Sequence, residues 1–105
     1  MRRSAEFRAV LRQGERHVGR LLVVYVSRSD GPARAGFVVG RNVGGAVRRN
    51  RARRLMKEAW RHMMERASLG IQVVFAARPE IDGVGLRAVA SDMERALAEA
   101  GALRP

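Results

Sequence analysis

The sequence has no cysteine, a single lysine and no long hydrophobic run, and the first and last of these shortages each exclude a class of protein. Without cysteine there can be no disulfide framework and no thiolate metal site, which suits a reducing cytoplasm. The longest apolar run, residues 21–26, is far shorter than the roughly 20 residues of a membrane-spanning helix. With 105 residues, 47% of them hydrophobic, the chain can bury one compact core. We therefore expect one cytoplasmic domain, residues 1–105, that does not enter a membrane.

Acidic residues are scarce as well. The chain carries 21 Lys and Arg against 10 Asp and Glu, which gives a net charge of +11. So large an excess repels itself unless an anionic partner neutralises it, and nucleic acid is the first candidate. All the basic residues except Lys57 are arginines, whose planar group suits phosphates and base edges, although a GC-rich genome would also favour arginine codons.

Glycine, serine and proline breaks divide the chain into short elements. Residues 4–13 are expected to form a helix that Gly14 can end, because three apolar residues recur at helical spacing. These are Phe7, Val10 and Leu11. Residues 21–27 and 35–41 are apolar and rich in β-branched side chains, so they predict two strands that pair as a hairpin.

The second half of the chain predicts another strand and a final helix. Residues 71–77 form an apolar run between two helical patterns, so this strand would join the sheet through a helical crossover. Residues 84–100 place four apolar side chains on one stripe, with Asp82 near the start of the helix. The stripe consists of Leu86, Val89, Met93 and Leu97.

The segment from Arg41 to Arg61 contains eight basic residues and one acid, Glu58, and so holds most of the net charge. At about 100° per residue, its apolar and basic side chains fall on opposite sides of a helix. The apolar side comprises Ala52, Leu55, Met56, Ala59, Trp60 and Met63. The opposite side comprises Asn50, Arg53, Arg54, Lys57 and Arg61. One helix is therefore expected to bury one side and to present a cationic stripe on the other.

This cationic stripe has two interpretations. A run of charges is usually a solvated helix face, but such a face mixes signs, and no acid occurs from Arg48 to Lys57. Like charges at this density repel until phosphates neutralise them, which favours nucleic acid. Gly44 and Gly45 before the helix form either a plain turn or, with the first helical amides, a phosphate site. A P-loop is excluded because its closing Lys-Ser or Lys-Thr is missing.

Residues 36–61, GFVVGRNVGGAVRRNRARRLMKEAWR, carry a resemblance to a known family. A glycine-led strand is followed by a basic residue, the sequence G-x-A-V, the triplet R-N-R and an arginine-rich helix with an aromatic residue near its end. This long, ungapped pattern is similar to the RNR motif of the bacterial ribonuclease P protein component. Further matches outside it are Phe7, Gly14, Tyr25, Val73, Val74, Ala77 and Arg78, so the resemblance covers nearly the whole chain.

The resemblance implies an α+β fold, a single-domain α/β sandwich of order αβββαβα similar to the ribosomal protein S5 domain 2-like fold. It also implies a left-handed βαβ crossover through the RNR helix, contrary to the right-handed rule for such units. The residues by themselves indicate three strands. The fourth is then expected either at residues 38–43, split from their neighbour, or in a short piece merged with another element.

The resemblance further implies the protein subunit of ribonuclease P, which binds a catalytic RNA and the 5′ leader of precursor tRNA and assists Mg²⁺-dependent removal of that leader. The implied contacts with the RNA subunit are Arg41, Arg48, Arg49, Asn50, Arg51, Arg53, Arg54, Lys57 and Arg61. The implied leader contacts, in a cleft between the first helix and the sheet, are Phe7, Leu11, Arg12 and Tyr25. Phe7 and Tyr25 fit burial in the core equally well. Leu11 stands where the family often has a second aromatic residue.

The sequence shows no catalytic site of its own, since His17 and His62 lie far apart without acidic partners in a metal-ligand pattern. By the resemblance, hydrolysis is carried by the RNA subunit, and Mg²⁺ is held mainly by that RNA and the substrate. The implied partners are ribonuclease P RNA and precursor tRNA, with no obligate protein partner.

Three other classes stay open on the residues alone. A helix-turn-helix DNA-binding protein has a basic recognition helix, but three sheet-forming runs fit that motif poorly. A ribosomal protein shares the charge and size of this chain, and the RNR spacing alone separates the two. A free-standing nuclease would need catalytic groups that the sequence does not display.

Overall fold

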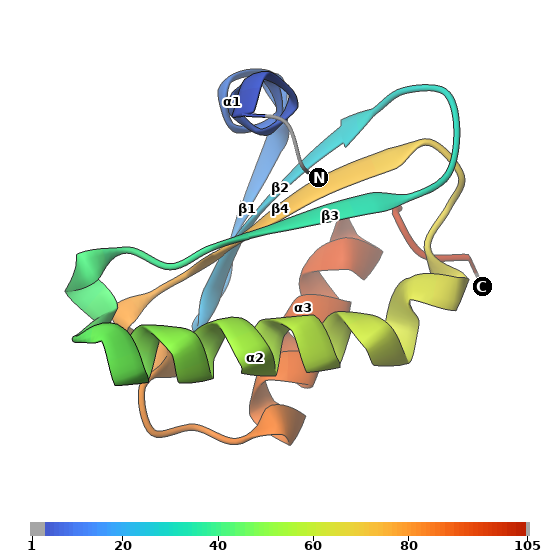
Figure 1. Ribbon diagram of the computed structural model, residues 1–105. Helices are drawn as coiled ribbons and strands as arrows, with labels where there is room; N and C mark the ends of the chain where they lie inside the picture. The colour runs from blue at the N-terminus through green and yellow to red at the C-terminus, as the bar shows by residue number, and fades with distance from the viewer. Residues whose placement is uncertain (1–3, 105) are drawn as a thin grey trace.

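The computed structural model describes residues 4–104 and contains a four-stranded sheet with helices on both faces (Figure 1). The helices are α1 (Ser4–Gln13), α2 (Ala46–Met63) and α3 (Leu86–Glu99), and the strands are β1 (Glu15–Val18), β2 (Leu22–Arg28), β3 (Arg34–Val38) and β4 (Ile71–Ala77). Short 3-10 helices at Arg41–Val43, Met64–Arg66 and Pro79–Ile81 connect them. The order αβββαβα is as expected. No helix within residues 4–104 is long and apolar enough to cross a membrane.

The sheet has the strand order β1-β2-β4-β3, so the last strand in the sequence lies in its interior. β4 pairs antiparallel with β2, where Val74 lies opposite Tyr25, and parallel with β3, where Val74 lies opposite Gly36. The hairpin expected between β2 and β3 is therefore wrong. β2 has β1 along one edge and β4 along the other, so no edge is left for β3, which reaches the sheet beside β4.

β1 is the strand that the sequence did not predict. Its four residues include one apolar side chain, Val18, and three of the four are exposed. A short polar edge strand gives no apolar alternation along the sequence, and it forms here because it pairs with β2 across a tight turn. The strand considered at residues 38–43 is wrong, since β3 ends at Val38 and residues 41–43 form a 3-10 helix.

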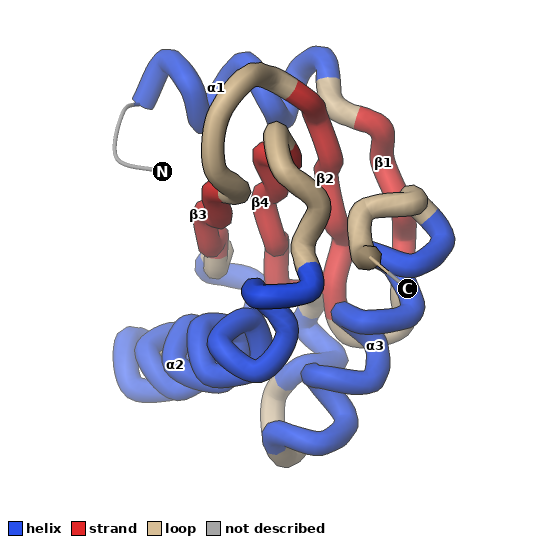
Figure 2. Tube along the Cα trace, turned by 90° about the vertical axis from the view of Figure 1, so that its right-hand side faces the viewer, coloured by secondary structure: helices blue, strands red, loops and turns tan. Residues whose placement is uncertain are grey.

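The connection from β3 through α2 to β4 is left-handed. Figure 2 views the molecule from the end at which β3 and β4 begin, and both strands run away from the reader. The chain passes from β3 on the left, down through α2, and up to β4 on the right. Seen with α2 in front of the sheet and both strands pointing up, β4 therefore lies to the left of β3. This is a left-handed crossover, which departs from the usual rule as the resemblance implied.

α2 and α3 cover one face of the sheet, and α1 lies over the other (Figures 1 and 2). Phe75 is fully buried at the centre of the larger core, with its ring 5.7 Å from the rings of Phe37 and Trp60. The buried helix residues are Ala52, Met56, Ala59, Trp60 and Met63 on α2 and Val89, Met93, Ala96 and Leu97 on α3. The apolar sides predicted for both helices are confirmed, with Leu55 and Leu86 only partly buried.

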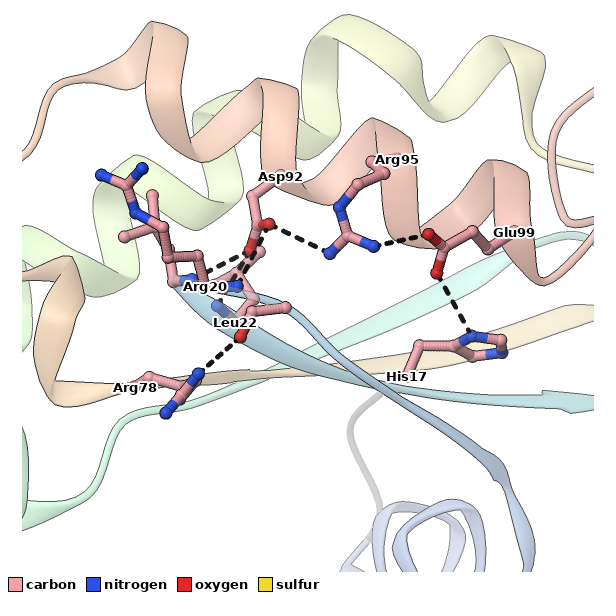
Figure 3. Close-up of polar contacts among 9 residues, drawn as sticks. His17, Arg20, Leu22, Arg78, Asp92, Arg95 and Glu99 are labelled. Atoms are coloured by element: carbon pink, nitrogen blue, oxygen red, sulfur yellow. Dashed lines mark hydrogen bonds and ion pairs between the residues drawn. The ribbon is translucent and has the colours of Figure 1, made fainter.

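Asp92 on α3 fastens the turn between β1 and β2 to that helix (Figure 3). Its carboxylate accepts hydrogen bonds from the backbone amides of Leu21 at 3.0 Å and Leu22 at 3.1 Å, and a longer one from Arg20 at 3.4 Å. The guanidinium of Arg95 donates another at 3.1 Å. Burial raises the pKa of the Asp92 carboxyl, but the hydrogen bonds together outweigh burial and the pKa is lowered.

Candidate nucleic-acid interface

Five polar residues on the solvent side of α2 form a stripe that we call the basic face. They are Asn50, Arg53, Arg54, Lys57 and Arg61. Arg53 is half-buried and the other four are exposed, while the opposite side of α2 packs into the core. A shallow depression of about 500 Å³, lined by Val47, Asn50, Arg53, Arg54 and Lys57, runs along this face. The two-sided helix predicted from the sequence is confirmed.

Four further arginines named by the resemblance do not lie on the basic face, and one of them, Arg41, is in the 3-10 helix before α2. Arg48 and Arg51 point toward the loop before α3, where Arg48 Nη1 lies 3.6 Å from Asp82 Oδ2 and Arg51 Nη2 donates to the Val84 carbonyl at 2.9 Å. Arg49 is half-buried, and its Nε is enclosed without a hydrogen-bond partner within residues 4–104. Of the RNR triplet, only Asn50 therefore belongs to the basic face. Arg51 instead joins α2 to the loop before α3.

Few of these cations are neutralised inside the protein. Arg61 pairs with Glu58 at 3.1 Å, but exposed pairs of this kind contribute little and leave the cation available. In the segment from Arg41 to Arg61, four outward-facing cations have no carboxylate partner within residues 4–104, namely Arg41, Arg53, Arg54 and Lys57. Arg53 Nη1 donates to Asn50 Oδ1 at 3.1 Å, which fixes the Asn50 amide so that its NH₂ group can donate outward.

The start of α2 adds hydrogen-bond donors to this surface. The first amides of an α-helix have no intrahelical partner, and Gly45 before α2 supplies no side-chain cap for them, so they can receive an anion. Gly44 has a φ of 139°, which strongly favours glycine. Val47 in the first turn is 82% exposed, an apolar side chain surrounded by donors that sequence reasoning did not single out.

A second surface lies on the side of the sheet that carries α1, and we call it the open sheet face. On β1, His17 points toward α3, where its Nδ1 is 3.9 Å from Glu99 Oε1 (Figure 3), so Arg16 and Val18 point to the opposite face. Two adjacent rows cross this face, Arg16, Tyr25, Val74 and Gly36 in one and Val18, Val23, Ala76 and Val38 in the other. Sequence reasoning missed Arg16 and Val18 because it missed β1.

α1 is oriented so that two implied leader residues turn toward the open sheet face. Val10 is 1% exposed and anchors the helix on the sheet, and Glu6 on one flank pairs with Arg34 of β3 at 3.5 Å. Phe7 and Leu11 lie on the other flank and are only partly buried. Tyr25 on the sheet is also half-buried. Arg12 is exposed on the side of α1 away from Val10 and therefore does not point to the sheet.

Each histidine lies beside a carboxylate, and His17 is half-buried while His62 is exposed. His17 Nε2 lies 2.8 Å from Glu15 Oε1, and His62 Nε2 lies 3.4 Å from Glu58 Oε1. In the part of the chain that the structure describes, no group of three or more His, Cys, Asp or Glu residues could hold a metal ion. The chemistry available to these two surfaces is the binding of phosphates by arginines and amides and the stacking of bases on an aromatic ring.

Known structures share this architecture. The RNase P protein of Staphylococcus aureus superposes with a TM-score of 0.87 over 99% of this chain and 96% of its own, at 22% sequence identity. The RNase P protein of Thermotoga maritima superposes with a TM-score of 0.84 over 94% of both chains, at 23% identity. At these identities the likeness establishes the fold.

The sequence comparisons establish the family. The protein-family model for Ribonuclease P matches residues 1–101. The ribonuclease P protein component of Acidothermus cellulolyticus is 44% identical over 101 residues, which cover 92% of this chain and 83% of the relative. That of Brevibacillus brevis is 33% identical over 91 residues, 85% of this chain and 72% of the relative. The chain therefore belongs to the ribonuclease P protein family, the protein components of the endoribonuclease complex that processes the 5′ ends of tRNA.

Proposed function

We propose that the chain binds the RNA of ribonuclease P through the basic face and the adjoining N-terminus of α2. The observation that carries this proposal is a group of four outward cations in the segment from Arg41 to Arg61 that have no carboxylate partner in the described part of the chain, namely Arg41, Arg53, Arg54 and Lys57. Unpaired cations on a folded surface repel one another, and phosphates relieve this repulsion while releasing counterions. The exposed Val47 gives the same surface an apolar contact for a ribose or a base edge.

The open sheet face is proposed to hold the single-stranded 5′ leader of precursor tRNA. Phe7 and Tyr25 are only partly buried and lie on the same side of the sheet, so their rings are available to stack on bases. Such stacking contributes about 1–3 kcal/mol per base and tolerates any base, which suits leaders of different sequence. Arg12, implied earlier as a leader contact, points away from the sheet. It would contact a leader phosphate only if the leader passed over the outer side of α1.

Hydrolysis is proposed to be carried by the RNA subunit, with Mg²⁺ held mainly by that RNA and the substrate. On this proposal the chain's own part lies in binding. Its arginines would hold the two RNAs together and screen the repulsion between their phosphates. The proposed partners are ribonuclease P RNA and precursor tRNA, and the function as proposed requires no second protein.

The test is cleavage of precursor tRNA by a bacterial ribonuclease P RNA at low Mg²⁺, with this protein, without it, and with the protein alone. Cleavage that rises only when both components are present is the expected result, because the protein replaces part of the screening that Mg²⁺ supplies. Tight binding to the RNA without any rise in cleavage would contradict the proposal and favour a ribosomal type of RNA binding. Cleavage by the protein alone would contradict the assignment of hydrolysis to the RNA.

A further inference from the structure

Arg16 occupies a distinctive place on the open sheet face. It lies on the edge strand β1 directly opposite Tyr25 of β2, and the alternation along β1 turns its side chain to the same face as the Tyr25 ring. Residues directly opposite each other on antiparallel strands have Cβ atoms about 5 Å apart, so the two side chains leave the sheet next to each other. Arg16 is exposed, and within residues 4–104 no carboxylate or carbonyl binds its side chain.

Among the described strand residues on the open sheet face, Arg16 is the one cation without an ion-pair partner. The adjacent row is entirely apolar, and its β1 member Val18 is 54% exposed. The other arginine on the same face, Arg34, lies on β3 at the far edge and is paired with Glu6. A strand of nucleic acid that stacks on Tyr25 and continues toward β1 therefore meets apolar side chains for its bases and one unneutralised guanidinium for its phosphates.

We propose that the leader continues past Tyr25 across β1 and that Arg16 binds one of its phosphates there. This inference rests on the proposed leader site and adds to it a residue that makes affinity depend on leader length. A leader that ends at Tyr25 gains nothing from Arg16, whereas one that reaches β1 gains a charge-assisted hydrogen bond. Arg16 is thus a substrate-binding residue and takes no part in binding the RNA subunit.

The experiment measures the affinity of the reconstituted holoenzyme for precursor tRNAs whose leaders lengthen one nucleotide at a time, with mature tRNA as the endpoint. The variants are Arg16→Ala, Arg16→Lys and the matched control Arg20→Ala. Arg20 is exposed at the turn after β1, beside α3 and away from the open sheet face, and its side chain has no ion pair or hydrogen bond within residues 4–104. Its loss therefore removes the same charge elsewhere. Thermal unfolding of each variant checks that the fold is kept.

The expected result is a loss of about fivefold in affinity for Arg16→Ala with long leaders, none with short leaders or mature tRNA, and partial recovery in Arg16→Lys. Arg20→Ala should match the wild type at every length. If Arg16→Ala shows the same dependence of affinity on leader length as the wild type, the role of Arg16 is overturned while the leader site stands. Equal losses for mature tRNA and precursor would also overturn it. If the wild-type protein shows no preference for a leader, the leader site itself is refuted.

Discussion

Replacing Arg54 by alanine removes one cation from the middle of the basic face with little effect on the fold. Arg54 is exposed and, within residues 4–104, its side chain forms no ion pair or hydrogen bond. Each phosphate contact contributes a slope of roughly 0.9 to the dependence of log affinity on log salt. With four such contacts, affinity for the RNA subunit should fall about 150-fold between roughly 50 and 200 mM monovalent salt, and with three contacts only about 40-fold.

The assay is equilibrium binding of the protein to ribonuclease P RNA across that salt range at constant Mg²⁺. Arg54→Ala should bind more weakly at low salt and approach the wild type as salt rises, because the lost contribution is the one that salt screens. Arg20→Ala again provides a matched loss of charge at a distant site. Parallel salt dependences for Arg54→Ala and the wild type would refute the assignment of the basic face, and an equal change in Arg20→Ala would attribute the effect to net charge.

The remaining predictions concern the leader site and the fold. Phe7→Ala should weaken binding of leader-bearing precursor and spare binding to the RNA subunit; equal losses for precursor and mature tRNA would make Phe7 structural. Asp92→Ala should lower the free energy of unfolding by about 2–3 kcal/mol in urea titrations at neutral pH. Because the Asp92 pKa is lowered in the folded state, this difference should persist above about pH 4 and disappear as the pH falls further; a constant difference would contradict it. Gly14→Ala should lower the free energy of unfolding by about 1–3 kcal/mol, because a Cβ would collide with the Val10 carbonyl oxygen and press on the Val26 backbone. The same clash should displace α1, which carries Phe7, and so weaken leader binding. Gly85→Ala, where a Cβ meets open space, is the control.

Periodicity along the sequence predicted the helices well because each buries one side. The helix at residues 4–13 has the predicted bounds, and the buried residues of α2 and α3 match the predicted stripes. The strand at residues 71–77 was also correct, since it is buried along most of its length and reads as a continuous apolar run. These elements are visible in the sequence because burial recurs at every helical turn or along the whole strand and leaves a regular pattern of apolar residues.

Strand pairing could not be obtained in the same way, because it depends on which elements meet and not on local pattern. β1 is short, polar and exposed, so no apolar signal marks it, and its absence left β2 free to be paired wrongly with β3. For the same reason the sequence did not predict that Arg16 and Val18, which lie on β1, belong to the candidate site. The basic stripe was predictable from helical spacing, whereas the bond from Arg51 to Val84 was not, because it joins residues far apart in the sequence.

The interior position of β4 has a consequence for synthesis of the protein on the ribosome. β1 and β2 can pair as soon as they emerge, but β3 has no partner until residues 71–77 have followed the whole of α2 out of the exit tunnel. A sheet closed by distant segments forms slowly, since the intervening chain must be ordered first. During that interval the arginine-rich segment of the nascent chain is synthesised but not yet folded against a core. RNA near the ribosome can therefore meet this segment as a flexible polycation before the basic face exists as a surface.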